Sequence, residues 1–225
     1  MEKIKVKAIL FDLWLTLASD KYYQEAGKSM ESMIIEKLNL NKSFKEVEKV
    51  VDTVLEKDKK KYIEEVFREL GAEFKQNDVD FFVEVLEKKI ASTELFADTI
   101  PSLKKLKEKK FKLGLITNSN IVRTPFVLNK SNLKDYFDSI TLSYKLGKIK
   151  PDSALFEKAL KELNVKPDET VMVGDSLQGD IIGAEKMGIK GILIKRGKEH
   201  WKETEGKPFA VISSLKELIG MVERK

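Results

Sequence analysis

Short apolar runs rich in β-branched residues recur along the chain, and segments with helical periodicity separate them. The runs predict strands at Val6–Phe11, Phe111–Thr117, Ser139–Ser143, Thr170–Val173, Gly191–Ile194 and Phe209–Ile212. Most of the intervals predict helices, at Ile100–Lys109, Ser153–Leu163, Ile181–Met187 and Leu215–Val222. Strands that alternate with helices are typical of a parallel sheet that is buried on both faces. The pattern therefore predicts an α/β core.

A second region interrupts this alternation, because no strand pattern is found from about Ser19 to Thr93. The region instead has long helical patterns at roughly Tyr22–Leu40, Phe44–Leu70 and Val79–Ile90, and Ser43 stands three residues before Glu46 as in a capping box. We expect residues 18–93 to form a helical subdomain inserted into a core of residues 1–17 and 94–225. Ligands of parallel sheets bind beyond the carboxyl ends of the strands, so the insertion could cover such a site. An appendage for dimer contacts is the alternative.

Polar residues of a similar kind follow several of the predicted strands. They are Asp12, Thr117, Asn118, Lys150, Asp175 and Asp180. Each alone has an ordinary explanation, since Asp and Asn cap helices and favour turns. Together, three carboxylates, a hydroxyl, an amide and a lysine at one rim of a sheet fit a site for Mg²⁺ and a phosphoryl group. Asp12 could attack phosphorus and form an aspartyl phosphate.

Composition narrows the chemistry of the 225-residue chain. Its 42 Lys and Arg and 37 Asp and Glu are interleaved and give a net charge of +5, which favours an ion-paired surface over nucleic-acid binding. The absence of Cys and the single His200 exclude disulfides, thiolate nucleophiles and zinc clusters built on Cys or His. No signal peptide or membrane span is indicated. We expect a cytoplasmic monomer or homodimer that acts on a small-molecule substrate, with no nucleic-acid or membrane partner.

The polar motifs resemble those of the haloacid dehalogenase-like (HAD) hydrolase superfamily over nearly the whole chain. "FDLWLTL" is similar to its first motif, D-x-D-x-T, and "LGLITNSN" to its second, a strand that ends in Thr or Ser. "KPDSALF" is similar to the third, a lysine before a helix, and "VGDSLQGD" matches the fourth, G-D-x-x-x-x-D, in full. The resemblance implies a Rossmann-like parallel-sheet core with an all-helical cap domain inserted after the first motif.

The resemblance also implies roles for individual residues. The implied catalytic residues are Asp12 as nucleophile and Lys150 as the group that neutralises charge. The implied ligands of Mg²⁺ are Asp12, the backbone carbonyl of Trp14, Asp175 and Asp180, the last of which could instead support Lys150. The implied substrate-binding residues are Thr16, Thr117 and Asn118, although Thr16 has local turn structure as an equal explanation.

Trp14 departs from the phosphatases of this superfamily. They carry a carboxylate at this position, which protonates the leaving oxygen and later activates water, and indole has no useful acid or base. Such assistance is typically worth roughly 10²–10⁴ in rate. The sequence predicts a weak phosphatase for alkyl phosphates, or a substrate whose leaving group needs no proton. Leu15 replaces a common Gly, which suggests an ordinary backbone conformation or an apolar side chain that faces the cap.

Two other functions remain open. The 2-haloacid dehalogenases of the superfamily have an aromatic residue where Trp14 stands and use no metal. They lack the carboxylate that this chain keeps as Asp175, and they use an arginine near the start of the cap, whereas the only arginine of this insertion is Arg68. We therefore favour a Mg²⁺-dependent phosphatase over a metal-independent dehalogenase. The third possibility is a catalytically degenerate HAD fold that acts as a binding protein.

Overall fold

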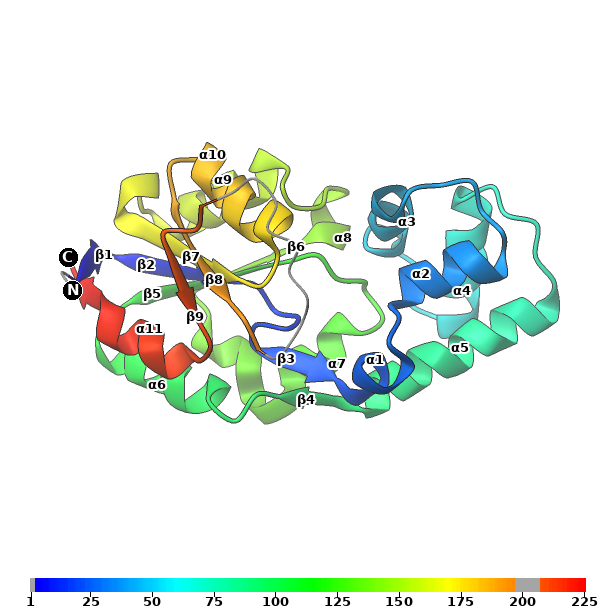
Figure 1. The fold of residues 1–225 in the computed structure, drawn as a ribbon, viewed down its shortest axis with the longest axis horizontal. Helices are drawn as coiled ribbons and strands as arrows, with labels where there is room; N and C mark the ends of the chain where they lie inside the picture. The colour runs from blue at the N-terminus through cyan, green and yellow to red at the C-terminus, as the bar shows by residue number, and fades with distance from the viewer. Residues whose placement is uncertain (1–2, 197–206) are drawn as a thin grey trace.

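The computed structural model describes residues 3–196 and 207–225, and His200 lies outside these ranges. Figure 1 shows an α/β core that contains both chain termini and a group of helices at the other end of the molecule. Within the described residues, no helix has the length and apolar content needed to cross a bilayer.

The core is built on a six-stranded sheet in the order β6-β5-β2-β7-β8-β9, with all pairs parallel. Its strands are β2 Ala8–Phe11, β5 Lys112–Thr117, β6 Ser139–Leu142, β7 Thr170–Gly174, β8 Lys190–Ile194 and β9 Ala210–Ile212. The predicted α/β parallel sheet is therefore confirmed. The order corresponds to the 3-2-1-4-5-6 order of doubly wound folds, in which the chain reverses its direction of winding at the first strand. Here that switch point lies at β2.

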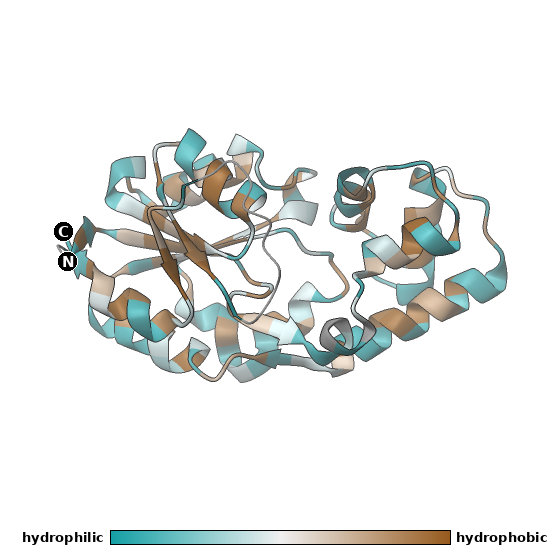
Figure 2. Ribbon diagram, viewed as in Figure 1, coloured by the Kyte–Doolittle hydropathy of each residue, from teal (hydrophilic) through white to brown (hydrophobic). Residues whose placement is uncertain are grey.

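Helices cover both faces of the sheet, which explains why its strands are continuously apolar. Ile9 and Phe11 of β2 pack in one buried cluster, and Ala8 and Leu10 pack in another on the opposite face. Figure 2 shows the strands as the most hydrophobic part of the core. The helices are α6 Thr99–Glu108, α7 Thr124–Asn129, α8 Ser143–Leu146, α9 Ser153–Leu163, α10 Gly183–Lys186 and α11 Leu215–Met221. A parallel pair of β1 Ile4–Val6 and β10 Val222–Arg224 joins the two ends of the chain.

The helical region between Lys21 and Ala91 has its own buried core. Its helices are α1 Lys21–Ala26, α2 Met30–Lys37, α3 Phe44–Val51, α4 Lys59–Glu69 and α5 Gln76–Ala91. The fully buried rings of Tyr62, Phe67 and Phe82 pack together there. The capping box that the sequence predicts at Ser43 begins α3. We refer to this region as the cap.

Two short strands connect the cap to the core, and the sequence pattern does not predict them. β3 Ala18–Asp20 and β4 Thr93–Leu95 pair in antiparallel fashion, and Figure 1 shows them between the core and α1 with α5. Each strand has only three residues and includes polar positions. No apolar alternation could therefore reveal them.

The backbone differs from the sequence-based expectation at Leu15 and near Leu177. Leu15 has a φ of 54°, so the expectation of an ordinary conformation there is wrong. The loop is tight, since the Leu15 amide donates to the Ala18 carbonyl at 2.7 Å, and a non-glycine residue in this region typically costs about 1–2 kcal/mol. The helix predicted at Ile181–Met187 begins earlier, as a π-helical turn at Leu177–Ile182 that continues into α10.

Gly174 provides a test of how tightly the end of β7 is packed. A Cβ built at this position would lie 2.2 Å from Asp180 Oδ2 and 2.5 Å from Asp180 Cβ. We expect Gly174→Ala to displace Asp180 and to lower the free energy of unfolding by about 1–3 kcal/mol, as overpacking does. Chemical denaturation measures this change. Gly220→Ala is the matched control, because a Cβ there meets nothing within 4 Å, and the added methyl group should stabilise α11 by up to about 1 kcal/mol. Equal effects of both substitutions would contradict the expected clash.

Candidate active site

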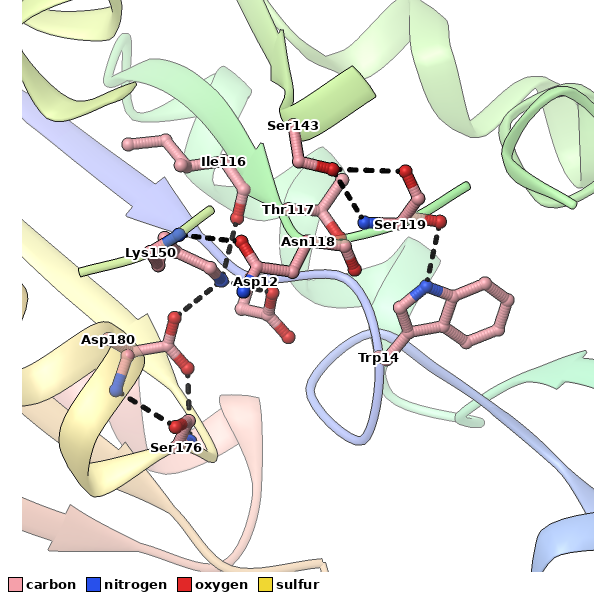
Figure 3. A network of polar contacts seen from close by, with 11 residues as sticks. Asp12, Trp14, Ile116, Thr117, Asn118, Ser119, Ser143, Lys150, Ser176 and Asp180 are labelled. Carbon is pink, nitrogen blue, oxygen red and sulfur yellow. Dashed lines mark hydrogen bonds and ion pairs between the residues drawn. The ribbon is translucent and has the colours of Figure 1, made fainter. Parts of the chain in front are cut away.

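Four charged side chains meet at the carboxyl ends of neighbouring strands. Asp12 directly follows β2 and Asp175 directly follows β7, and these two strands pair at the switch point of the sheet. Asp180 lies on the π-helical turn after β7, and Lys150 lies in the loop between α8 and α9. Figure 3 shows Lys150 between Asp12 and Asp180. This is the location in which doubly wound folds bind ligands.

The Lys150 ammonium links the two aspartates through short contacts. Its Nζ lies 2.5 Å from Asp12 Oδ1, 2.5 Å from Asp180 Oδ1 and 3.1 Å from the Ile116 carbonyl oxygen. Lys150 is only 5% exposed. Burial alone would lower the pKa of this ammonium, but the two carboxylates outweigh burial and hold the pKa above its usual range. Lys150 is therefore a permanent positive charge at the centre of the site.

The carboxylates outnumber the ammonium. Asp12, Asp175 and Asp180 offer oxygen atoms that all lie within 4.8 Å of one another. Burial raises the pKa of Asp12 to about 7, although Lys150 opposes this rise and Asp180 adds to it. Burial, followed by the charges of Asp12 and Asp180, also raises the pKa of Asp175. Three ionised carboxylates beside one ammonium leave two negative charges, which a divalent cation with hard oxygen ligands would balance.

The three carboxylates differ in which oxygen atoms are available to a cation. Asp180 Oδ1 accepts from Lys150, and its Oδ2 accepts from the Ser176 amide at 3.0 Å. Asp12 uses Oδ1 for Lys150, which leaves Oδ2 for a ligand. Within residues 3–196 and 207–225, no hydrogen bond is made to the Trp14 carbonyl oxygen. These donors, with Asp175, are oxygen ligands of the type that Mg²⁺ prefers.

The residues expected to bind substrate occupy different positions. Asn118 lines the cavity above Asp12, and its Oδ1 accepts from the Lys150 amide at 2.8 Å. Thr117 is fully buried at the end of β5, and its hydroxyl lies 3.2 Å from the Asn118 carbonyl oxygen. Thr16 is also fully buried, and its carbonyl oxygen accepts two hydrogen bonds from Arg196. Of these three, only Asn118 is among the residues that line the cavity.

Trp14 lies two residues after Asp12, lines the same cavity and is held on two sides. Its Nε1 donates to Ser119 Oγ at 3.0 Å, and the Arg123 guanidinium lies 3.9 Å from the centre of its ring. Arg123 also pairs with Asp20 at 2.7 Å. These contacts hold the indole in place, and its only polar hydrogen already forms a hydrogen bond to Ser119. The ring offers no proton to a ligand bound at Asp12.

The site opens into a cavity of about 530 Å³ between the core and the cap. Cap residues that line it include Glu31, Phe44, Lys45, Glu48, Asp52 and Lys89. Arg68 of the cap pairs with Glu64 and Glu65 on α4 and is not among the residues that line the cavity. The cavity arginine is instead Arg123, which lies just after the polar loop that follows β5. The closeness of Arg123 to that loop in the sequence is the feature that could have identified it.

Comparison with known proteins agrees with this geometry. The family model for the haloacid dehalogenase-like hydrolases matches residues 6–188. A glyceraldehyde 3-phosphate phosphatase from Methanopyrus kandleri is 32% identical over 199 residues, which cover 86% of this chain and 85% of that protein. A second one, from Pyrococcus furiosus, is 37% identical over 126 residues, which cover 55% of this chain and about half, 52%, of that protein.

A solved structure of a HAD phosphatase is also similar to this chain. The crystal structure of a HAD phosphatase from Thermococcus onnurineus is 25% identical to this chain, with a TM-score of 0.64 over 96% of this chain and 99% of the other. The family match covers the residues that carry the four motifs, and it spans most of the chain. The protein is therefore an enzyme that belongs to the haloacid dehalogenase-like hydrolase family.

Proposed function

We propose that this hydrolase is a Mg²⁺-dependent phosphatase that acts on a small phosphorylated compound. The observation that carries the proposal is the buried Asp12–Lys150–Asp180 network, with Asp175 beside it, at the mouth of a cavity. The named relatives suggest a triose phosphate such as glyceraldehyde 3-phosphate as substrate. A cavity of about 530 Å³ is ample for a molecule of this size.

In the proposed reaction Asp12 is the nucleophile. An oxygen of its carboxylate attacks phosphorus as the bond between phosphorus and the leaving oxygen breaks, and water then hydrolyses the aspartyl phosphate to release phosphate. Lys150 fixes Asp12 through Oδ1, so the attacking oxygen has one orientation. Asn118, held by the Lys150 amide, lies where its side chain can contact the phosphoryl oxygens.

The metal site in this proposal is formed by Asp12, Asp175 and the Trp14 carbonyl. A bound Mg²⁺ would neutralise charge on the transferring phosphoryl group. We assign Asp180 to the support of Lys150, because both of its oxygens are already engaged. The excess of negative charge among the three carboxylates, of which Asp12 and Asp180 are buried, is what supports a divalent cation here.

Removal of the nucleophile tests the proposal directly. We expect Asp12→Asn to lower phosphate release from glyceraldehyde 3-phosphate and from acetyl phosphate by at least about a thousand-fold, since loss of a nucleophile is seldom compensated. A colorimetric phosphate assay measures the rate. Asp168→Asn is the control, because this exposed aspartate lies before β7, at the opposite end of the strand from Asp175. The proposal is overturned if the enzyme releases no phosphate from either compound with Mg²⁺ but releases halide from 2-haloacids in the presence of chelator.

The metal dependence has its own test. Asp175→Asn removes one proposed ligand without removing the nucleophile. We expect it to raise the Mg²⁺ concentration needed for half-maximal activity by at least about ten-fold, because affinity depends on the number of charged ligands. Titration of metal-free enzyme with MgCl₂ provides the measurement. Full wild-type activity in excess EDTA, or an unchanged Mg²⁺ requirement in this variant, would contradict the assignment.

A further inference from the structure

The proposed reaction lacks a proton donor at position 14. An alkoxide leaving group needs a proton as its bond to phosphorus breaks, and the Trp14 indole cannot supply one. Lys150 cannot supply it either, because two carboxylates hold its charge. If the enzyme hydrolyses an alkyl phosphate efficiently, another group that faces the cavity must act.

The cap presents one face of α3 to the cavity. Phe44, Glu48 and Asp52 all line the cavity and are spaced by four residues, a spacing that places side chains on the same side of a helix. Asp52 is the residue that ends α3. A carboxyl group at a helix C-terminus faces the negative end of the helix dipole, which disfavours its ionised form.

A chain of hydrogen bonds fixes the end of α3 close to Trp14. The Ser143 hydroxyl donates to the Asp52 carbonyl at 2.8 Å and accepts from the Ser119 amide at 3.0 Å. Ser119 Oγ in turn accepts from Trp14 Nε1 at 3.0 Å, and Figure 3 shows the part of this chain that runs from Ser143 through Ser119 to Trp14. The backbone of Asp52 is therefore linked, through Ser143 and Ser119, to the indole of Trp14, and both residues line the same cavity.

The Asp52 side chain is buried and has no partner. It is 7% exposed, and among the described residues no group donates a hydrogen bond to its carboxyl group or forms an ion pair with it. The charged groups around it are Glu31 on α2, Glu48 on α3, Arg123 after β5 and Lys150 in the core. Burial raises the pKa of Asp52 well above its usual value, and the two glutamates raise it further. Because no cation forms an ion pair with it, burial favours the protonated form of the Asp52 carboxyl group.

We propose that Asp52 of the cap is the general acid that protonates the leaving oxygen, in place of the absent carboxylate at position 14. This inference rests on the proposed phosphatase function. As Asp12 forms its bond to phosphorus, the Asp52 proton moves to the departing oxygen and the free alcohol results. The Asp52 carboxylate then takes a proton from the water that attacks the aspartyl phosphate, which returns the site to its starting state.

Glu48 is the nearest competitor for this role, and its contacts indicate a different one. The Asn118 side chain, which lines the same cavity, opposes the rise in the pKa of Glu48 that burial causes, and so does the charge of Lys150. Glu48 is also only half-buried, so solvent can stabilise its ionised form. Of the two carboxyl groups on this face of α3, Asp52 is the one without a donor that favours the anion.

The test compares substrates that need a proton with one that does not. We expect Asp52→Asn to lower kcat/KM for glyceraldehyde 3-phosphate by roughly 10²–10⁴, the usual contribution of a general acid. Its kcat/KM for acetyl phosphate, whose leaving acetate needs no proton, should stay within about three-fold of wild type. Glu48→Gln is the matched variant and should show no such selectivity. Equal losses by Asp52→Asn on both substrates, or a selective loss by Glu48→Gln alone, would overturn the assignment.

A second measurement tests the protonation state and checks that the variant folds. A carboxyl group whose pKa is raised by folding destabilises the protein progressively as pH rises from its unfolded value toward its folded value. Asn carries no such penalty, so the Tm of Asp52→Asn should increase relative to wild type between pH 5 and pH 8. A constant difference across this range would mean that Asp52 is not held protonated, which contradicts the proposal.

The two proposals fail in distinguishable ways. If wild-type enzyme releases no phosphate from glyceraldehyde 3-phosphate, acetyl phosphate or p-nitrophenyl phosphate with Mg²⁺, the phosphatase function itself is wrong, and with it the role of Asp52. If wild-type enzyme hydrolyses all three and Asp52→Asn retains the same preference among them, the phosphatase function stands and only the assignment of Asp52 is wrong.

Discussion

The ion pairs of the Lys150 ammonium are the interaction on which the rest of the site depends. A charge buried without a partner costs several kcal/mol, so Lys150, Asp12 and Asp180 each require the others. Because Asp12 follows β2 and Asp180 follows β7, these contacts also fix two neighbouring strand ends relative to the loop before α9. The Lys150 amide adds Asn118 after β5. A single residue therefore connects three strands of the sheet and fixes the carboxylate of Asp12, the proposed nucleophile.

The charges of this network favour a bound divalent cation, and the cap encloses them. Asp175 adds a further carboxylate to a cluster that one ammonium cannot balance, and burial disfavours each charge in the absence of a counterion. The cap completes the enclosure, since the Ser143 hydroxyl bonds the end of α3 to the loop after β5. Exclusion of water in such a cavity strengthens every remaining electrostatic contact with a bound phosphoryl group.

The sequence predicted the sheet well, because strands buried on both faces must be apolar throughout, as Ala8–Phe11 is. It could not predict the strand order, since every strand–helix unit has the same local pattern. β3 and β4 are too short to show a periodic pattern of apolar residues. The positive φ of Leu15 could not be predicted, because no glycine or other typical turn residue stands at this position. The polar residues that follow the strands could be recognised in the sequence because a site for Mg²⁺ and a phosphoryl group needs side chains of these types. Asp52 was not identified because its place in the cavity comes only from the packing of the cap against the core, whereas Arg123 could have been noticed from its closeness to the loop after β5.

A proton donor on the cap changes the effect that Trp14 has on the proposed reaction. In the core alone, the indole removes the acid and leaves a site suited to leaving groups that need no proton. With Asp52 in the same cavity, the nucleophile and the acid come from different parts of the chain, and the site for alkyl phosphates is complete only where α3 packs on the loop that holds Trp14 and Ser119. The indole, which Arg123 and Ser119 hold in place, then forms part of the lining of the cavity in which the proposed proton transfer from Asp52 takes place. Efficient reaction of a poor leaving group thereby depends on the contact between the cap and the core.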